Sequence, residues 1–314
     1  MQRSPEWWRR SRSAIANAGV LAGKGQGVKH EEPSADDSIA ALERAAQRHE
    51  AHFEGRRVVW RRFGEGAPVV LLHGGHGDWL HWSRNIAVLA THHAVWVPDM
   101  PGYGESDDPR QPTLESIVAA TSATLDSLVG ARTPVALVGF SFGALVATHL
   151  AMRRGAISRL VLVGPAGHGG ARRPRGDLRP WRRAHERRDL AALREVMRHN
   201  LLMHMLRDDA SADDLALRIH TDACLRARFR SKPISRSGGL VACLAGYAGP
   251  TLLVWGEHDV TAEPTQAALA LCQGRADRRS CIVPGAGHWA QFERADTINA
   301  LLLEWLGGCP VPGI

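Results

Sequence analysis

Ser141 is the residue whose surroundings point most directly to chemistry. It is the centre of a Gly-Phe-Ser-Phe-Gly pentapeptide at 139–143, which follows an apolar run at 134–138 and precedes a helix-like stretch at 144–152. A strand that turns sharply into a helix needs glycines beside the serine, because side chains would collide there and the serine holds a strained backbone angle. The pattern predicts a nucleophile elbow that lifts the Ser141 hydroxyl above a sheet.

A serine hydroxyl is a weak nucleophile at neutral pH unless a base takes its proton and an acid orients that base. Asp259 and then His288 follow downstream, each directly after a short apolar run. The carboxyl ends of parallel strands share one edge of a sheet, so loops that leave different strands can bring these side chains together. We predict Ser141 as nucleophile, His288 as general base and then acid, and Asp259 as the orienting acid, with Glu257 as the alternative acid.

A tetrahedral oxyanion needs two N–H donors, and loss of one typically costs about 3 kcal/mol of transition-state stabilisation. We predict the Phe142 N–H, directly after the nucleophile, as one donor. The second is expected in the glycine-rich loop at 73–78, after another apolar run. Gly75 is the predicted donor, and His76 replaces it if the register differs. Gly74 and His76 are then expected to contact the substrate.

The same loop carries His73, His76 and Asp78, a spacing that could suggest a metal site. It departs from the usual H-x-H-x-D-H arrangement, and no matching distal ligands are apparent. The glycines at 164–170 do not have G-x-G-x-x-G spacing, because Pro165 intervenes and arginines follow instead of a helix. We therefore expect no metal and no cofactor.

Taken together, these motifs resemble those of the α/β-hydrolase superfamily, and within it the branch of meta-cleavage-product (carbon-carbon bond) hydrolases. The resemblance covers residues 55–306. It is carried by the His-Gly-Gly loop, Met-Pro-Gly-Tyr-Gly-Glu-Ser at 100–106, the elbow, and Gly-His-Trp-Ala-Gln-Phe-Glu at 287–293. The branch typically has Gly-His-Trp-Ala-Gln-Trp-Glu in the last of these places.

The resemblance also implies substrate-binding residues. In that branch the tryptophan after the catalytic histidine and an arginine on a lid helix line the pocket, which correspond by position to Trp289 and Arg218. The branch usually has Asn before the nucleophile and Met after it, whereas this chain has Phe140 and Phe142. We therefore expect a more apolar pocket, with Phe140 against the substrate.

From residue 56 onward, apolar runs alternate with helical stretches, which predicts an α/β fold with a doubly wound, mostly parallel sheet. The alternation stops between the strand after the elbow helix and residue 250, where such hydrolases insert a helical cap over the active site. The predicted parts are a flexible N-terminal extension at 1–50, with a short helix starting at Ser38, a core at 51–164 and 250–314, and a helical cap (lid) at 165–249. Strands are expected at 58–63, 69–73, 94–98, 135–139, 160–164, 251–255 and 280–284, and a helix at 295–305.

Composition agrees with a globular enzyme. The chain has 314 residues, of which 44% are hydrophobic and 23% charged, and its five cysteines include no C-x-x-C pair. An odd number of scattered cysteines indicates reduced thiols, so we expect a cytoplasmic protein. No apolar stretch reaches the roughly 20 residues that cross a bilayer. The basic start and weakly apolar stretch at 9–22 make a poor export signal.

The net charge of +7 is concentrated in arginines of the predicted cap, at 172–188. These could form a solvated helix face without a ligand, or steer an anionic substrate to the pocket. No recognition motif or aromatic stacking platform accompanies them, so neither nucleic acid nor a membrane is expected as a partner. The expected partner is a small-molecule substrate, and a homo-oligomer stays open.

The prediction from all of these features is a cofactor-independent serine hydrolase that acts on an ester, a lactone or a vinylogous diketone. Thioesterase, amidase or haloperoxidase-like perhydrolase chemistry would use the same triad, and some members of the superfamily are small-molecule receptors. An epoxide or haloalkane hydrolase would need Asp at position 141, so Ser141 excludes both.

Overall fold

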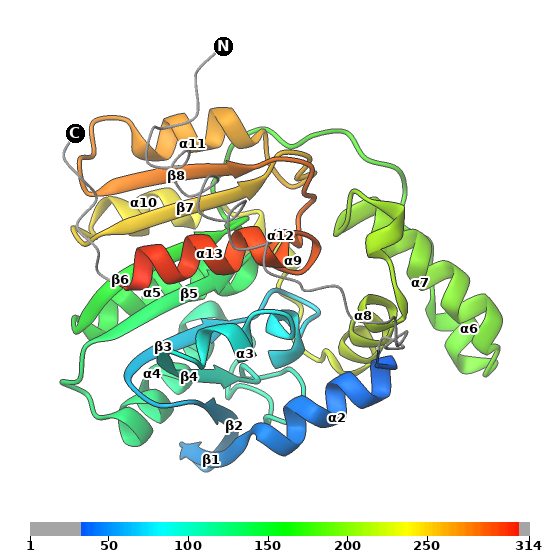
Figure 1. The fold of residues 1–314 in the computed structure, drawn as a ribbon, viewed down its shortest axis with the longest axis horizontal. Coiled ribbons are helices and arrows are strands. Elements are labelled where there is room, and N and C mark those ends of the chain that lie inside the picture. Colours follow the sequence, from blue (N-terminus) through cyan, green and yellow to red (C-terminus); the bar gives the residue numbers. More distant parts are fainter. Residues whose placement is uncertain (1–32, 308–314) are drawn as a thin grey trace, which may run out of the picture.

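The computed structural model describes residues 33–307, which fold around one eight-stranded sheet (Figure 1). The strand order is β1-β2-β4-β3-β5-β6-β7-β8, with β2 antiparallel to β1 and β4 and all later neighbours parallel. The strands are β1 (Gln47–Phe53), β2 (Arg56–Phe63), β3 (Ala67–Leu72), β4 (His93–Pro98), β5 (Val135–Phe140), β6 (Ile157–Val163), β7 (Thr251–Gly256) and β8 (Arg278–Val283). The predicted mostly parallel α/β fold is confirmed.

Helices cover both faces of the sheet, so strand side chains on both sides are buried, as parallel sheets require. Side chains of β3 alternate accordingly: Val69 and Leu71 belong to one apolar cluster, and Val70 and Leu72 to the other. The first face is covered by α3 (Ile86–Leu89), α12 (Ala290–Glu293) and α13 (Ala295–Leu306). The second is covered by α4 (Leu114–Val129), α5 (Phe142–Arg154) and α11 (Pro264–Cys272).

The register of the central strands places the chemistry. β3 and β5 are parallel neighbours, and Leu72 at the end of β3 lies opposite Gly139 near the end of β5. The loop that follows β3 and the turn that follows β5 therefore leave the sheet side by side, at its carboxyl edge. The loops after β7 and β8 leave from the same edge, since all of these strands run parallel.

Residues 165–249, between β6 and β7, form only helices and loops, and we call them the cap segment. Figure 1 shows α6 and α7 projecting to one side of the sheet. The helices of the segment are α6 (Arg182–Glu186), α7 (Leu190–His204), η2 (Asp209–Ser211), α8 (Asp214–Arg226), α9 (Lys232–Ser235) and α10 (Gly239–Ala245). The helical character expected for this segment is present, and its standing as a separate domain stays a prediction.

The N-terminal region differs from its prediction. Residues 1–32, including the export-like start, lie outside the described residues, and the helix α2 (Ala35–Ala45) begins after Ser34, not at Ser38. The Ser34 hydroxyl accepts a hydrogen bond from the Asp37 N–H (3.1 Å), a typical helix N-cap. Residues 47–53, expected to be helical, form the edge strand β1, which a tight turn at Glu54 and Gly55, both with positive φ, joins to β2. Residues 47–53 are mostly polar, so the sequence did not indicate a strand there.

Helix α2 connects the core with the cap segment. Asp36 forms an ion pair with Arg218 on α8, and Glu43 lies 3.6 Å from the buried Arg61 guanidinium of β2. Ile39 and Leu42 are partly buried against the core, but no residue of the helix is fully buried.

Two further properties bear on the expectations from composition. Cys224, Cys243, Cys272 and Cys281 are free thiols, and Cys309 lies outside the described residues. None of the described helices has both the length and the apolar character that a membrane span requires.

Candidate active site

Ser141 occupies a sharp turn between β5 and α5. Its φ of 53° lies in the left-handed region, and its N–H donates to the Val163 carbonyl of β6 (2.8 Å). The flanking glycines are required by close backbone contacts: a Cβ at Gly139 would lie 2.4 Å from the Gly143 carbonyl oxygen, and one at Gly143 would lie 2.3 Å from the His73 carbonyl oxygen. Helix α5 packs too tightly on the sheet for any side chain there, which explains the G-x-S-x-G pattern.

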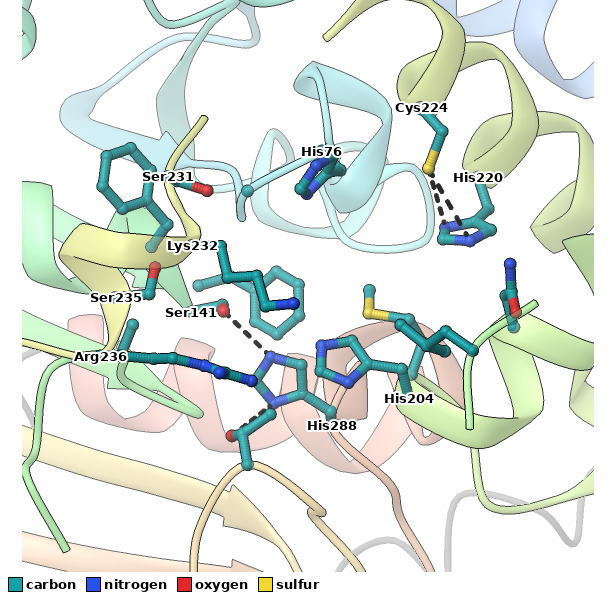
Figure 2. A pocket seen from close by; sticks show the side chains of 18 of the residues that line it. His76, Ser141, His204, His220, Cys224, Ser231, Lys232, Ser235, Arg236 and His288 are labelled. Carbon is teal, nitrogen blue, oxygen red and sulfur yellow. Dashed lines mark hydrogen bonds between the residues drawn. The ribbon is translucent and has the colours of Figure 1, made fainter. Parts of the chain in front are cut away.

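The three predicted catalytic residues meet at the carboxyl edge of the sheet. His288 Nε2 lies 3.0 Å from Ser141 Oγ, and His288 Nδ1 lies 2.9 Å from Asp259 Oδ2 (Figure 2). Asp259 is fully buried and His288 is almost fully buried. Ser141 makes no capping bond to α5, so its hydroxyl is available to the imidazole. Glu257, the alternative acid, instead accepts a hydrogen bond from the Gly285 N–H (2.9 Å) and does not reach His288.

Thr261 holds the buried carboxylate of Asp259 in place. Its N–H and its hydroxyl both donate to Asp259 Oδ1, at 2.7 Å each. Burial alone would raise the pKa of Asp259. The charge and the hydrogen bond of His288, with the two bonds from Thr261, outweigh burial and hold that pKa below its usual range. Asp259 is therefore ionised at neutral pH and can orient His288 through Nδ1.

Two buried histidines clamp the Gly74 peptide at the start of the glycine-rich loop. Because the Met100 N–H donates to His73 Nε2 (2.9 Å), the His73 proton is on Nδ1, which donates to the Gly74 carbonyl (2.8 Å). The Gly74 N–H donates to His81 Nδ1 (3.2 Å). Burial lowers the pKa of His73 to about 4, so it stays neutral. The clamp fixes the loop beside Ser141.

The ring of His81 fits against Gly77, which explains the third glycine of the loop. A Cβ at Gly77 would lie 2.1 Å from His81 Cε1. Asp78, considered above with a metal site, caps η1 (Trp79–Trp82) by accepting from the Leu80 N–H (3.0 Å). These residues shape the loop that is expected to supply an oxyanion donor.

The triad opens into a cavity of about 330 Å³ between the core and the cap segment. Gly75 and His76 from the loop after β3 line it, together with Ser141 and Phe142 at the start of α5. The first N–H groups of a helix have no partner within the helix, so the Phe142 N–H has the position expected of an oxyanion donor. The cap segment supplies Ala166, His168, Arg172, Arg175, Leu178, Trp181, Asn200, His204, Met205, His220, Cys224, Ser231, Lys232, Ser235 and Arg236.

The charge of this lining is one-sided. Arg172, Arg175, Lys232 and Arg236 are cationic, and no Asp or Glu is among the described residues that line the cavity. No described carboxylate forms an ion pair with any of the four. Burial and then repulsion from Arg236 lower the pKa of Arg172, and the opposing charge of Asp259 offsets this only in part. Figure 2 shows Lys232 and Arg236 extending from α9 over Ser141 and His288.

Several predicted substrate-binding residues are not where the resemblance placed them. Arg218 does not line the cavity: it lies on the outer face of α8, paired with Asp222 (2.7 Å) and with Asp36. Two residues along a helix turn the side chain by about 200°, so His220, not Arg218, faces the cavity. Trp289 is fully buried behind the wall, where its Nε1–H donates to the His81 carbonyl (2.9 Å).

Phe140 and His76 do line the cavity, whereas Gly74 lies behind it. A Cβ at Gly74 would lie 3.0 Å from the Phe140 ring, so this glycine serves close packing. Phe140 also packs against His288, with ring centroids 5.0 Å apart. The pocket side of the elbow is therefore apolar, as the two phenylalanines predict.

Most of the cavity residues missed from the sequence come from the cap segment; His81 and Thr261, which lie in core loops, were missed as well. Lys232 and Arg236 are four apart across the short helix α9, which places both on one face, and the same holds for His220 and Cys224 on α8. That spacing was available in the sequence. Which face turns to the core was not, because it depends on how the cap helices pack.

Comparison with known proteins decides the family. The model of the alpha/beta hydrolase family matches residues 69–301, most of the chain. The chain belongs to this family. Among curated relatives of this alpha/beta hydrolase is 2-hydroxy-6-oxononadienedioate/2-hydroxy-6-oxononatrienedioate hydrolase 2 of Pseudomonas putida, 31% identical over 295 residues, 86% of this chain and 98% of the relative.

A second relative of the alpha/beta hydrolase is the 2-hydroxy-6-oxo-6-phenylhexa-2,4-dienoate hydrolase of Burkholderia cepacia, 28% identical over 80% of this chain and 91% of the relative. The crystal structure of a mutant meta-cleavage product hydrolase superposes with a TM-score of 0.65 at 23% identity, covering 83% of this chain and 98% of that one. The predicted superfamily and its resemblance to this branch are confirmed, and the relatives support hydrolase activity.

Proposed function

We propose that this protein is a cofactor-independent serine hydrolase in which Ser141, His288 and Asp259 form the catalytic triad. The observation that carries the proposal is the unbroken chain of contacts from Ser141 Oγ through His288 to the ionised Asp259 carboxylate, at the wall of a cavity. Ser141 Oγ attacks the substrate carbonyl while His288 Nε2 accepts the hydroxyl proton. The leaving group takes that proton from His288, and water then hydrolyses the acyl-enzyme by the same route.

The oxyanion of each tetrahedral intermediate is held by the N–H groups of Phe142 and Gly75. The Phe142 N–H is at the N-terminus of α5, where the helix dipole adds to its attraction for negative charge. Gly75 follows the peptide that His73 and His81 clamp, so its N–H is held in position before the substrate arrives. Preorganised donors of this kind are typically the largest single contribution to acyl-transfer catalysis.

The substrate carries an anionic group that binds beside Arg172, Arg175, Lys232 and Arg236, and we call this part of the cavity wall the cationic mouth. No described carboxylate pairs with these four cations, so they favour an anionic group of the substrate. A hydrogen bond between two charged groups is stronger than one between neutral groups, and partial burial strengthens it further. Among the predicted substrate classes of ester, lactone and vinylogous diketone, we favour a diketone that bears a carboxylate, because both relatives described above are named as hydrolases of such dienoates. In that chemistry His288 also assists ketonisation of the dienol before the carbon-carbon bond breaks.

A fluorophosphonate probe tests the nucleophile. It should label Ser141 in the wild type, and Ser141→Ala should abolish the labelling. Failure to label, in a protein that binds dienoates, would favour a receptor instead of an enzyme. Turnover that survived Ser141→Ala would rule out the triad mechanism.

The reaction class is tested by kcat/KM for p-nitrophenyl esters of graded chain length against carboxylate-bearing dienoate ring-cleavage products. We expect the dienoates to be the better substrates. Arg236→Met should raise KM for an anionic substrate about tenfold and leave KM for a neutral ester unchanged. Arg153→Met, at an exposed site on α5 outside the cavity, is the matched control and should change neither. An equal effect of Arg236→Met on both substrates would contradict an anionic substrate.

A further inference from the structure

The cavity has a second polar region, formed by histidines, which adjoins the cationic mouth: burial and then the charge of Lys232 lower the pKa of His76. His76 from the loop after β3, His204 at the end of α7 and His220 in α8 face one space (Figure 2). Each ring is close enough to the next to influence its protonation: the pKa of His220 responds to His76, and that of His204 responds to His220. Three imidazoles from three separate elements therefore surround a single volume.

These histidines have unused hydrogen-bonding capacity. Within residues 33–307, His204 Nδ1 is buried without a partner, and the hydrogen-bond contacts of the His220 ring nitrogens are to Cys224 Sγ alone, at 3.9 and 4.0 Å. Asn200 of the lining, in contrast, is satisfied: it accepts from the Arg179 N–H (2.7 Å) and donates to the Arg179 carbonyl (2.9 Å). His81 Nε2, also in the lining, is buried without a described partner. A buried polar group without a partner costs about 1–3 kcal/mol, so a ligand that supplies one gains that free energy.

Backbone strain marks the same place. Among the described residues only four non-glycine residues have positive φ, and two of them, His76 (56°) and Ser141 (53°), line the cavity. Conformations of this kind cost on the order of 1–3 kcal/mol and persist where the surrounding structure imposes them, often at sites of function. The strain at Ser141 belongs to the nucleophile, and that at His76 belongs to the second polar region.

The electrostatic surroundings select the kind of ligand. Burial, followed by the charges on His288 and Arg175, lowers the pKa of His204 to about 3, and burial lowers that of His220 to about 4. Neutral imidazoles surrounded by cations can each donate one N–H to an anionic oxygen. No group of three or more His, Cys, Asp or Glu side chains in the described part of the chain is placed to bind a metal ion. An alkyl or phenyl group would leave all three rings unpaired.

We propose that the space between His76, His204 and His220 binds a carboxylate at the far end of the substrate, which makes a dicarboxylate the preferred ligand. One carboxylate lies at the cationic mouth, the second lies among the histidines, and the reacting carbonyl lies between them over Ser141. This placement of the carbonyl rests on the proposed function, whereas binding of the second carboxylate does not require catalysis.

Equilibrium binding to the Ser141→Ala protein tests the proposal without turnover. Calorimetry with heptanedioate and heptanoate, which differ only in the second carboxylate, should show tighter binding of heptanedioate by about tenfold to a hundredfold, the range expected for one or two hydrogen bonds to a charged group. Equal affinities would overturn the proposal. So would equal affinity for heptanedioate and its monoamide, because the histidines would then not select a charge.

Variants assign the preference to residues. In the Ser141→Ala protein, His220→Leu and His204→Leu should each reduce the ratio of the two affinities at least about threefold, whereas His220→Asn, which keeps an N–H donor, should retain most of it. His185→Leu, on the exposed surface of α6, is the control and should leave the ratio unchanged. Circular dichroism identifies any variant that does not fold. If a variant fails to fold, the comparison of heptanedioate with heptanoate in the Ser141→Ala protein still tests the proposal. Unchanged ratios in folded leucine variants would refute the assignment.

The two proposals fail separately. Absence of fluorophosphonate labelling in the wild-type protein would remove the proposed hydrolase while leaving the affinity ratio as it is. An affinity ratio of one would remove the second carboxylate site while leaving Ser141 labelling intact.

Discussion

The hydroxyl of Thr261 offers a sharp test of how the triad is supported. Thr261→Val keeps the shape of the side chain and removes one hydrogen bond to the buried Asp259 carboxylate, while the bond from the Thr261 N–H stays. It also removes the contact of the hydroxyl with His288 Nδ1 (3.2 Å). A hydrogen bond to a charged group contributes about 1.5–3 kcal/mol, and Thr261 and Asp259 are both buried, so solvent does not replace it. We expect the free energy of unfolding at pH 8 to fall by about that amount.

The effect on turnover should be smaller than the effect on stability. Asp259 is ionised both in the ground state and in the transition state, so most of the contribution of the lost bond cancels between the two. What changes is the orientation of the carboxylate, and through it the orientation of His288. We expect kcat to fall on the order of tenfold with KM unchanged, which is less than the roughly hundredfold that a misplacement of 1 Å can cost.

The pH dependence has a defined sign. The folded-state pKa of Asp259 lies below its usual range, so the stability that its ionisation contributes is present above the unfolded-state pKa and is lost as the pH falls through the folded-state pKa. Thr261→Val removes a cause of that depression, so its folded-state pKa is higher. Acid unfolding of the variant, followed by circular dichroism, should therefore begin at a higher pH than in the wild type.

Thr121 supplies a matched control for the same substitution. It is fully buried, and its hydroxyl has no hydrogen-bond partner. Thr121→Val should leave stability unchanged or increase it, since replacing an unpaired buried hydroxyl by a methyl group removes a desolvation cost. If both variants lost the same stability, or if the acid unfolding of Thr261→Val matched that of the wild type, the hydroxyl would not support the Asp259 carboxylate as argued.

Three further substitutions have clear expected outcomes. Gly77→Ala would displace His81 and with it the clamped loop, so kcat and the rate of fluorophosphonate labelling should fall about tenfold to a hundredfold; unchanged labelling would separate this loop from the oxyanion site. Arg218→Met should leave KM unchanged and cost no more than about 1 kcal/mol of stability, because its pair with Asp36 is exposed; a large rise in KM would restore it to the pocket. Trp289→Phe should lower the free energy of unfolding by about 1–3 kcal/mol, measured in urea, with KM unchanged, since it removes one buried hydrogen bond outside the cavity and leaves a void where the larger indole packed.

The sequence was sufficient to predict the triad, because local chemistry and the parallel order of the strands determine where its three residues lie. Ser141 needs glycines on either side, and Asp259 and His288 each follow a strand, so their meeting at one sheet edge follows from the parallel order. The sequence was insufficient for β1, because an edge strand exposed to solvent does not need alternating apolar residues. Polar residues at 47–53 therefore resembled the continuation of a helix.

The cap segment shows the second limit. Arg218 and His220 are two positions apart on α8, and either could face the substrate on the evidence of sequence alone. The packing of α8 against its neighbours determines that His220 does. Lys232 and Arg236 were likewise not recognisable, since α9 spans only Lys232–Ser235 and its direction follows from the loops on both sides.

Helix α2 is expected to unfold locally at a lower free energy than the rest of the described chain. It has no fully buried residue, so its backbone amides should exchange with solvent at a free energy far below that of global unfolding. Its Asp36 also forms the ion pair that joins α2 to Arg218 of the cap segment. When α2 unfolds locally, α8 loses the ion pair between Arg218 and Asp36. The part of the cavity wall that contains His220 is then more mobile. Admission of large substrates can therefore be limited by an element that never touches them.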